Sequence, residues 1–117
     1  MSGGLQYFPY AGQILMCRFD GNLVPEMTKT RPVIVITPRP IAQKKGTVSV
    51  IPLSTTSPQR IMPYHVPVAL PRPVPEGFDA SCWAKCDMIY TAGLARLNLI
   101  RMGKAPGGRR IYYQKTM

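Results

Sequence analysis

The stretch Pro32-Val33-Ile34-Val35-Ile36-Thr37 decides the fold expected of this 117-residue chain. Its four central residues are all β-branched and apolar, a composition that favours an extended strand. The run shows no alternation of apolar and polar residues, which indicates that both faces of the strand are covered by other parts of the protein. The sequence therefore predicts a strand at residues 32–37 that is buried on both faces.

Two further strands are expected on either side of this run. One is Gln13–Phe19, which a polar loop at Asp20–Thr30 separates from the central run. The other is Thr47–Leu53, which is rich in β-branched residues. Between the central run and this last strand lies Arg39–Gly46, which contains a proline and three basic residues and is predicted to be a loop. The first half of the chain is therefore expected to consist of short strands joined by turns.

The second half of the chain continues this pattern. Tyr64–Leu70 and Ser81–Ile89 are predicted strands, and the three prolines of Pro71–Gly77 predict an extended loop between them. Because Pro67 lacks a backbone N–H, the first of these two strands is expected at an edge of the sheet. The remaining expected elements are a short helix capped by Thr91 and reaching Asn98, a basic stretch at Arg101–Arg110 and a strand at Ile111–Gln114.

Proline and glycine restrict the fold class. Thirteen prolines and ten glycines leave little room for long helices. Several short strands with hardly any helix predict a mostly β protein, built as a small barrel or strongly bent antiparallel sheet with one or two short helices. No internal repeat divides the chain, so residues 1–117 are expected to form a single domain.

The balance of charge favours an anionic partner. Fifteen Lys and Arg residues against five Asp and Glu residues give a net charge of +10, which suits a nucleic acid or an acidic protein. The alternative is a solvated surface that keeps the protein soluble. Residues 1–13 have neither the basic start nor the apolar core of a signal peptide, and no apolar run is long enough to cross a bilayer. We therefore expect a cytoplasmic protein without a membrane partner.

The cysteines do not predict a disulfide framework, because Cys17, Cys82 and Cys86 are an odd number in a chain without an export signal. Together with His65 they have the composition of a zinc site with three thiolates and one imidazole. The spacing of Cys82 and Cys86, however, lacks the short-loop context of such sites. The sequence predicts buried thiols, with neither a metal nor another cofactor.

An acid and a guanidinium, Glu26 and Arg31, flank the end of the loop before the central strand. Pro32 disfavours the helical conformation at Arg31, so the arginine is expected to be extended and to project in a fixed direction from the start of a buried strand. A planar, permanently charged group in that position suits a phosphate. The alternative is a simple ion pair between Glu26 and Arg31 across the loop.

A second group of candidate residues lies on the strand predicted at Ser81–Ile89. If side chains alternate along it, Trp83, Lys85 and Asp87 share one face, and the small and apolar residues between them share the other. An indole can stack on an RNA base, while Lys85 and Asp87 can bind phosphate or move protons. The alternative is a surface ion pair beside an exposed tryptophan. His65, the only histidine, is either a proton shuttle near neutral pH or a packing or surface residue.

Three ordered motifs resemble the PemK/MazF family of type II toxin–antitoxin systems. They are Gly12–Leu15 with Glu26, Arg31-Pro32 and the following Val/Ile strand; Val50–Thr55, a strand that ends in Pro, an aliphatic residue and two hydroxyl residues; and Trp83–Asp87, followed by Thr91 and Arg96-Leu97. The resemblance spans about Gly12 to Leu97. Two departures stand out: Lys85 replaces an arginine common in the family, and Gly103–Gly108 interrupts the region where the family has a C-terminal helix.

The resemblance implies an SH3-like barrel that forms a homodimer, docks a cognate acidic antitoxin and cuts single-stranded messenger RNA without a metal. In such a reaction the ribose 2′-hydroxyl attacks the adjacent phosphate and a cyclic phosphate forms. By the family match, Ser54 and Thr55 face the substrate, and we expect them to stabilise the developing charge together with Arg31.

The remaining roles follow from the chemistry of the other candidates. Glu26 or Asp87 is expected to act as the general base, and Lys85 to neutralise phosphate or to assist the leaving oxygen. Further RNA contacts are expected from one aromatic and four basic or ionisable residues, Trp83, Arg39, Lys44, Lys45 and His65.

Two other functions remain open from the sequence. The first is a gyrase-poisoning toxin of the CcdB-like kind, which shares the fold but binds a protein. Such poisons end in Trp-Gly-Ile, whereas this chain ends in Lys115-Thr116-Met117. The second is a basic barrel that binds RNA or DNA without cutting it.

Overall fold

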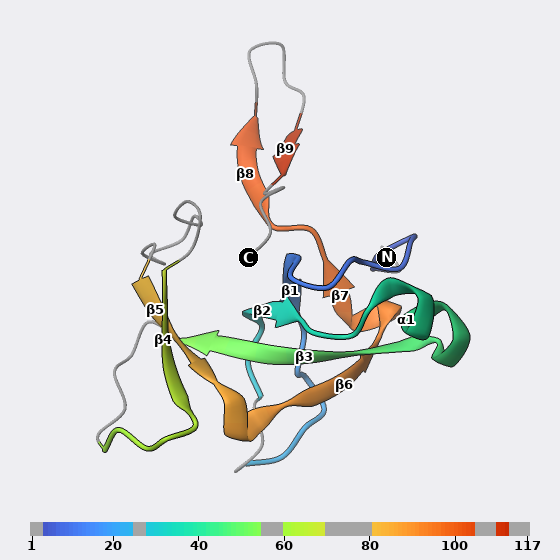
Figure 1. Ribbon diagram of the computed structural model, residues 1–117. Coiled ribbons are helices and arrows are strands. Elements are labelled where there is room, and N and C mark those ends of the chain that lie inside the picture. Colours follow the sequence, from blue (N-terminus) through green and yellow to red (C-terminus); the bar gives the residue numbers. More distant parts are fainter. Residues whose placement is uncertain (1–3, 25–27, 55–59, 70–80, 105–109, 113–117) are drawn as a thin grey trace.

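The structure is a computed structural model that describes residues 4–24, 28–54, 60–69, 81–104 and 110–112 (Figure 1). Nearly all of its regular structure is short strand. The strands are β1 (Ile14–Cys17), β2 (Arg31–Val35), β3 (Thr47–Ser54), β4 (His65–Ala69), β5 (Ser81–Lys85), β6 (Tyr90–Gly93), β7 (Leu97–Asn98), β8 (Arg101–Lys104) and β9 (Arg110–Tyr112). The helical elements are α1 (Arg39–Lys45) and two 3₁₀ turns, η1 (Cys86–Met88) and η2 (Leu94–Arg96).

Seven of these strands form one antiparallel sheet in the order β4-β5-β3-β2-β1-β7, with β6 also paired to β3. The long strand β3 makes the sheet bend, because it has β2 on one edge and two different strands on the other. Its first half pairs with β6 from Thr47 to Val50, and its last two residues pair with β5. Figure 1 shows β5 and β6 meeting at an angle below β3. The sheet is barrel-like without being closed, which confirms the predicted mostly β fold with a bent antiparallel sheet.

The central strand is buried on both faces, as its unbroken apolar run predicts. Val33 and Val35 belong to a first core cluster with residues of β1, β3, β6 and β7. Ile34 packs against a second cluster on the other face, formed around Ile14 and Leu53. The prediction was wrong only at its end, because Ile36 lies beyond β2 and is 40% exposed.

The segment Arg39–Gly46 was expected to be a loop, but residues 39–45 form α1. Pro40 lies at the start of this helix, where a missing N–H removes no intrahelical hydrogen bond. Gly46 ends the helix with a φ of 79°, and its N–H donates to the carbonyl of Ala42 at 2.7 Å. Ala42 is fully buried in the first cluster, so α1 covers one face of the sheet.

The helix expected at Thr91–Asn98 is also absent. Tyr90–Gly93 is strand β6, η2 follows as a single 3₁₀ turn, and Leu97–Asn98 pairs with β1 as β7. Pairing with β3 supplies the backbone hydrogen bonds that a helix would otherwise provide. The long-range pairing with β3 therefore outweighs the local preference of this segment for a helix.

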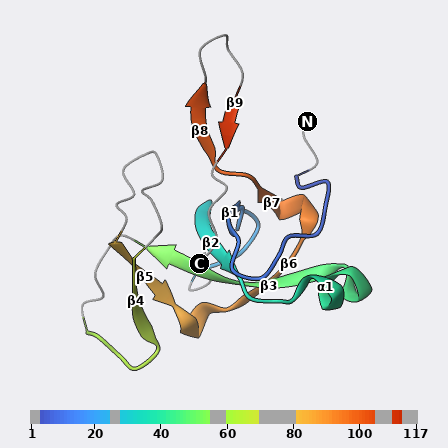
Figure 2. The same cartoon turned by 45° about the horizontal axis from the view of Figure 1, so that its top comes forward.

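The C-terminal region differs from the expectation as well. Part of the basic stretch, Arg101–Lys104, is strand β8, and it pairs with β9 to form a separate two-stranded sheet. Figures 1 and 2 show this hairpin standing away from the main sheet. The expected strand at Ile111–Gln114 starts one residue earlier, at Arg110, and is described only to Tyr112. The loop predicted at Pro71–Gly77 lies outside the described residues.

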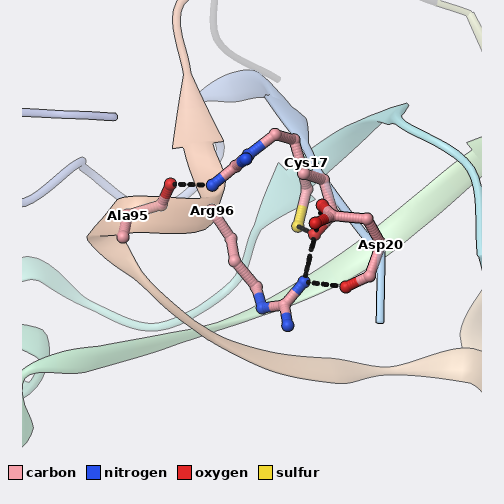
Figure 3. A network of polar contacts seen from close by, with 5 residues as sticks. Cys17, Asp20, Ala95 and Arg96 are labelled. Atoms are coloured by element: carbon pink, nitrogen blue, oxygen red, sulfur yellow. Dashed lines mark hydrogen bonds and ion pairs between the residues drawn. The ribbon is translucent and has the colours of Figure 1, made fainter. Parts of the chain in front are cut away.

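The N-terminal segment and two arginines fix η2 to the rest of the fold. Leu5 is buried in the first cluster, and its N–H donates to the carbonyl of Leu94. Arg96 donates from Nη1 to the carbonyls of Arg18 and Asp20, both at 2.9 Å, while Arg18 donates from Nη2 to the carbonyl of Ala95 at 2.9 Å (Figure 3). These reciprocal bonds join the end of β1 to η2.

Strand β4 lies at an edge of the sheet, as the presence of Pro67 predicts. β4 is the outermost strand, and Pro67 lies within it. An edge strand tolerates a residue without an N–H because only one of its two sides takes part in a ladder.

In the part of the chain that the structure describes, no helix is long and apolar enough to cross a membrane.

Candidate active site

The strand registers bring several candidate residues together on one face of the sheet. Arg31 is paired with Cys17 of β1, and Ser54 is paired with Trp83 of β5. Directly paired residues of an antiparallel ladder project from the same face. The β2–β3 register pairs Val33 with Pro52. If the same register is continued by two residues along each strand, Arg31 comes opposite Ser54.

We call Cys17, Arg31, Ser54 and Trp83 the Arg31 row. Neighbouring strands lie about 4.8 Å apart, so the distance from β2 to β5 along this row is about 10 Å. Because residues two apart on a strand share a face, the row lies on the same face as Val33 and Val50 of the first core cluster. The row therefore lies where this buried face reaches the start of β2 and the end of β3.

A second pair of candidates lies next to the row. His65 of β4 is paired with Lys85 of β5, and Pro67 is paired with Trp83. Lys85 is two residues from Trp83 on the same strand and hence shares its face. Trp83, Lys85 and His65 are all half-buried. The alternation of side chains along the sequence correctly predicts that Trp83 and Lys85 share a face. The position of His65 opposite Lys85 follows only from the pairing of β4 with β5.

Arg31 has an environment that suits an anion. It is half-buried at the first position of β2, and its Nε is buried without a hydrogen-bond partner among the described residues. A buried donor that lacks a partner is costly, and guanidinium groups bind carboxylate and phosphate oxygens well. The position of Arg31 at the start of the central strand is the one that its Pro32 neighbour predicts.

Ser54 is the one buried polar residue among those described, with 2% of its surface exposed. It ends β3 directly after the buried Leu53. A hydroxyl at this position is a small group that both donates and accepts hydrogen bonds at the end of β3. Thr55, the second hydroxyl of the motif, lies outside the described residues, as does Glu26.

His65 has a defined ring orientation. Its Nδ1 accepts a hydrogen bond from the backbone N–H of Met62 at 3.0 Å, and its ring meets that of Tyr64 edge-on, with centroids 4.7 Å apart. An Nδ1 that accepts a hydrogen bond carries no proton, so in the neutral ring the proton is on Nε2. The nitrogen left to exchange a proton with a ligand is therefore Nε2.

Asp87 does not share the face of Trp83 and Lys85, contrary to the prediction. Strand β5 ends at Lys85, and Cys86–Met88 turn as η1, so the alternation of side chains stops two residues before Asp87. Asp87 is exposed. The turn forms here because the chain must leave β5 and reach β6 on the same edge of β3.

The basic residues predicted to contact RNA are not part of the Arg31 row. Arg39, Lys44 and Lys45 belong to α1, which follows the opposite end of β2. Lys44 and Lys45 are exposed in the last turn, where positive charge is favourable for the helix dipole. Arg39 contacts Tyr10, a residue that the sequence did not single out. No periodicity or motif links two residues that are 29 positions apart.

The cysteines are unpaired thiols, and no group of three or more His, Cys, Asp or Glu side chains with the geometry of a metal site occurs among the described residues. Cys17 and Cys82 are buried, as predicted, and Cys86 is half-buried. Burial raises the pKa of the Cys17 thiol from 9.0 to about 11, although the positive charges of Arg96 and Arg18 oppose this effect. Burial also raises the pKa of the Cys82 thiol. Neither thiol is a nucleophile at neutral pH.

The raised pKa of Cys17 predicts a loss of stability in alkaline solution. Its contribution is present below pH 9.0, where the thiol is protonated in both states, and is lost as the pH rises toward about 11. Between pH 8 and pH 10.5 the free energy of unfolding should fall by on the order of 2 kcal/mol from this group alone. Urea unfolding of the native protein and of Cys17→Ala over this pH range checks it. Equal pH dependence in the two proteins would contradict it.

Comparisons with known proteins agree with this architecture. Residues 10–108 match the family model described as a PemK-like, MazF-like toxin of type II toxin–antitoxin systems. None of the curated proteins matches the chain. Among solved structures, an endoribonuclease in complex with its cognate antitoxin from a mycobacterial species has a TM-score of 0.59 and 17% identity, covering 93% of this chain and 80% of that chain.

Two structures from Deinococcus radiodurans have the same fold. MazF in its first crystal form has a TM-score of 0.58 and 21% identity, and the match covers 87% of this chain and 86% of that chain. The MazE–MazF complex in its second form has a TM-score of 0.52 and 18% identity, with 96% and 83% covered. At these identities the likeness supports the fold.

Proposed function

Because this chain belongs to the family of PemK-like, MazF-like toxins of type II toxin–antitoxin systems, we propose that it is an endoribonuclease. Its substrate is single-stranded messenger RNA, and the reaction needs no metal ion. The observation that carries this proposal is the Arg31 row, in which the strand registers align a guanidinium, a hydroxyl and an indole on one face of the sheet. Each of these groups has a use in binding and cleaving RNA.

The reaction is an attack of one ribose 2′-oxygen on its own 3′-phosphorus. The bond between the 2′-oxygen and phosphorus forms as the bond from phosphorus to the 5′-oxygen of the next nucleotide breaks. The base takes the proton of the 2′-hydroxyl, and an acid gives a proton to the 5′-oxygen. The products are a 2′,3′-cyclic phosphate and a 5′-hydroxyl, so neither water nor a cofactor enters this step.

Arg31 stabilises the negative charge that accumulates on the phosphate oxygens, and Ser54 assists it from the next strand. A preorganised donor at such a position typically contributes about 10²–10³-fold to the rate. The buried Nε of Arg31 supports this role, because the guanidinium has donor capacity that the described part of the chain does not use. Thr55 is proposed as a further donor from the family match.

The proton transfers are assigned to groups around the row. Glu26 is the preferred general base, because the structure takes Asp87 off the face that carries Lys85 and exposes it in η1. Lys85 and His65 are paired across β4 and β5, so either can reach the same region of the substrate. Lys85 neutralises phosphate, and Nε2 of His65 is the nitrogen that we propose to give a proton to the leaving oxygen.

The proposed RNA contacts extend beyond the chemical step. Trp83 stacks on a base next to the cleaved phosphate. The basic residues of α1, Arg39, Lys44 and Lys45, attract phosphates of a neighbouring part of the strand. A chain with a net charge of +10 binds RNA with strong salt dependence.

The partners are proposed from the family and from charge. Two of the similar solved structures are complexes of a toxin with its antitoxin, and an acidic antitoxin would complement the positive charge of this chain. We propose that the protein is a homodimer, like other toxins that the resemblance covers, and that it acts in the cytoplasm, where messenger RNA is available.

The test is cleavage of a long single-stranded RNA by the purified protein in the presence of a chelator. We expect fragments that end in a 2′,3′-cyclic phosphate, as detected by mass spectrometry. A synthetic RNA around a mapped cleavage position should stay intact when that one ribose is replaced by 2′-deoxyribose, because the attacking oxygen is missing. Cleavage of the 2′-deoxy substrate, or intact RNA in the first reaction, would refute the proposal.

A further inference from the structure

Tyr10 is an exposed aromatic residue that the fold holds in a fixed position. Its side chain is 58% exposed, yet three contacts constrain the residue. Nη1 of Arg39 donates to its hydroxyl at 2.7 Å, and the guanidinium carbon of Arg39 lies 4.7 Å from the centre of its ring. Its backbone N–H donates to Oε1 of Gln13 at 3.2 Å. We call Tyr10, Gln13 and Arg39 the Tyr10 platform.

The local backbone explains why these residues meet. Tyr10–Gln13 is a tight turn in which the N–H of Gln13 donates to the carbonyl of Tyr10. Gly12 has a φ of 88° in this turn, a conformation that glycine adopts without strain. The turn is fixed to the end of β2 because the N–H of Gly12 donates to the carbonyl of Val35, and the N–H of Val35 donates to that of Gln13. Arg39 then approaches from the start of α1.

The arrangement leaves aromatic surface for a ligand beside a guanidinium whose hydrogen bonds are not all used. Arg39 contacts the Tyr10 ring, and over half of the Tyr10 surface is exposed. Nε of Arg39 is buried without a hydrogen-bond partner in the described part of the chain. Exposed apolar side chains of Ile36 and Ile41 lie on the neighbouring segments. A fixed ring beside a guanidinium is the combination that stacks a nucleobase and binds its phosphate.

The charge around the platform favours a nucleic acid. Lys44 and Lys45 end the helix that Arg39 begins. Residues 1–19 and 27–75 contain no Asp or Glu, so the segments that build the platform carry positive charge alone. The acids that the structure does describe, Asp20 and Asp87, lie before β2 and in η1.

The platform and the Arg31 row lie near opposite ends of β2, and the segments that build the platform cover the face of the sheet that carries the row. Arg31 and Val35 are the first and last residues of the strand, about 13 Å apart at 3.3 Å per residue. The row shares its face with the first core cluster, which α1 and the N-terminal segment cover through Ala42 and Leu5. The platform belongs to these covering segments. Stacked nucleotides repeat at about 3.4 Å, so the length of β2 corresponds to about four stacked nucleotides, or fewer in an extended strand.

We propose that the Tyr10 platform is a distal RNA subsite, in which one base of the substrate strand stacks on Tyr10 while Arg39 binds its phosphate. This inference rests on the proposed function for the identity of the ligand, and it adds a base contact two to four nucleotides away from the cleaved phosphate. Tyr10 touches the substrate far from the reacting atoms, so it affects binding of the substrate and leaves the chemical step unchanged.

The test is a double-mutant cycle between the protein and an RNA of about 12 nucleotides, a length within the reach of such basic surfaces. The RNA contains 2′-deoxyribose at the mapped cleavage position, and an abasic nucleotide replaces each base in turn. Binding is measured by fluorescence anisotropy. With the native protein, one abasic position two to four nucleotides from the cleaved phosphate should weaken binding by about 5- to 100-fold.

In Tyr10→Leu this abasic penalty should shrink to within about twofold, whereas Tyr10→Phe should keep it because the ring remains. Tyr7→Leu is the matched control: Tyr7 is 38% exposed and its hydroxyl accepts from Nε2 of Gln13, so its loss loosens the same turn without removing the platform ring. The control should keep the penalty, and thermal unfolding should show all three variants folded. A purely structural Tyr10 would make Tyr7→Leu and Tyr10→Leu alike.

An abasic penalty that persists in Tyr10→Leu, or a scan without any such position, would overturn the inference. The inference would also be overturned if Tyr10→Leu left the abasic penalty unchanged but weakened the binding of a poly-glutamate peptide. The platform would then be a protein-docking surface. The result is separable from the proposed cleavage. If the protein does not cut RNA, no cleavage position is mapped, but the abasic scan of an all-ribose oligonucleotide still shows whether the penalty at any one base depends on Tyr10.

Discussion

Arg31→Ala should lower the rate of RNA cleavage by about 10²–10³-fold while leaving the protein folded. The reason is that the substitution removes the permanent positive charge of the Arg31 row, and no other guanidinium among the described residues is paired into that row. Arg31→Lys should restore only part of the activity, because an ammonium group keeps the charge but loses the planar pair of donors. Single-turnover cleavage of a mapped oligonucleotide measures both effects.

The matched control is Arg60→Ala, which removes an equal charge from an exposed position that has no assigned role. It should change the single-turnover rate by less than about threefold, as expected for a surface charge that is screened by solvent. Equal losses in Arg60→Ala and Arg31→Ala would mean that general positive charge, and not the Arg31 row, supports cleavage.

The largest effect on stability is expected at Phe19. Its side chain is fully buried in the first core cluster, and its ring meets that of Tyr90 edge-on with centroids 5.1 Å apart. Phe19→Ala removes this contact and leaves a cavity between the end of β1 and β6, so the free energy of unfolding should fall by about 3–5 kcal/mol. Domains of this size have only about 5–15 kcal/mol in total, so partial unfolding at 37 °C is expected.

Tyr64→Ala is the comparison for Phe19→Ala, because Tyr64 also forms an edge-on ring contact but is 40% exposed near the sheet edge. It should cost less than about 1.5 kcal/mol in urea unfolding. If Phe19→Ala cost no more than Tyr64→Ala, the first cluster would not be the main core of the protein.

The central strand and the position of Arg31 could be predicted from sequence because both depend on local chemistry. β-branched residues and Pro32 act on the backbone within one or two positions. The same holds for Trp83 and Lys85, whose common face follows from strand alternation. That argument failed at Asp87, where η1 ends the alternation for a reason of topology: the chain has to move from one half of β3 to the other.

The errors in secondary structure have opposite causes. The sequence of α1 predicts a loop because Pro40 and Gly46 favour turns, although Pro40 occupies a position at the helix start that tolerates proline. The segment from Thr91 was assigned to a helix because its capping residue gives a local signal, whereas the structure uses it to pair with β3. A ladder between residues that are 40 or more positions apart leaves no trace in a local window.

The composition of the site depends on registers that the sequence does not encode in any single segment. Arg31, Ser54 and Trp83 come from three strands, and only the pairing of β3 with both β2 and β5 aligns them. The contact of Tyr10 with Arg39 likewise needs the turn before β1 and the start of α1 to meet at the end of β2. Motifs could therefore indicate which residues matter, but not which of them act together.

The most direct test of the central claim, that the Arg31 row forms the active site of an RNA-cutting toxin, is primer-extension mapping of cellular RNA ends after brief expression. The native protein and Arg60→Ala should produce the same new 5′ ends at a recurrent short sequence, and Arg31→Ala should produce none at equal protein levels. The same ends from Arg31→Ala, or no new ends from the native protein, would contradict the account.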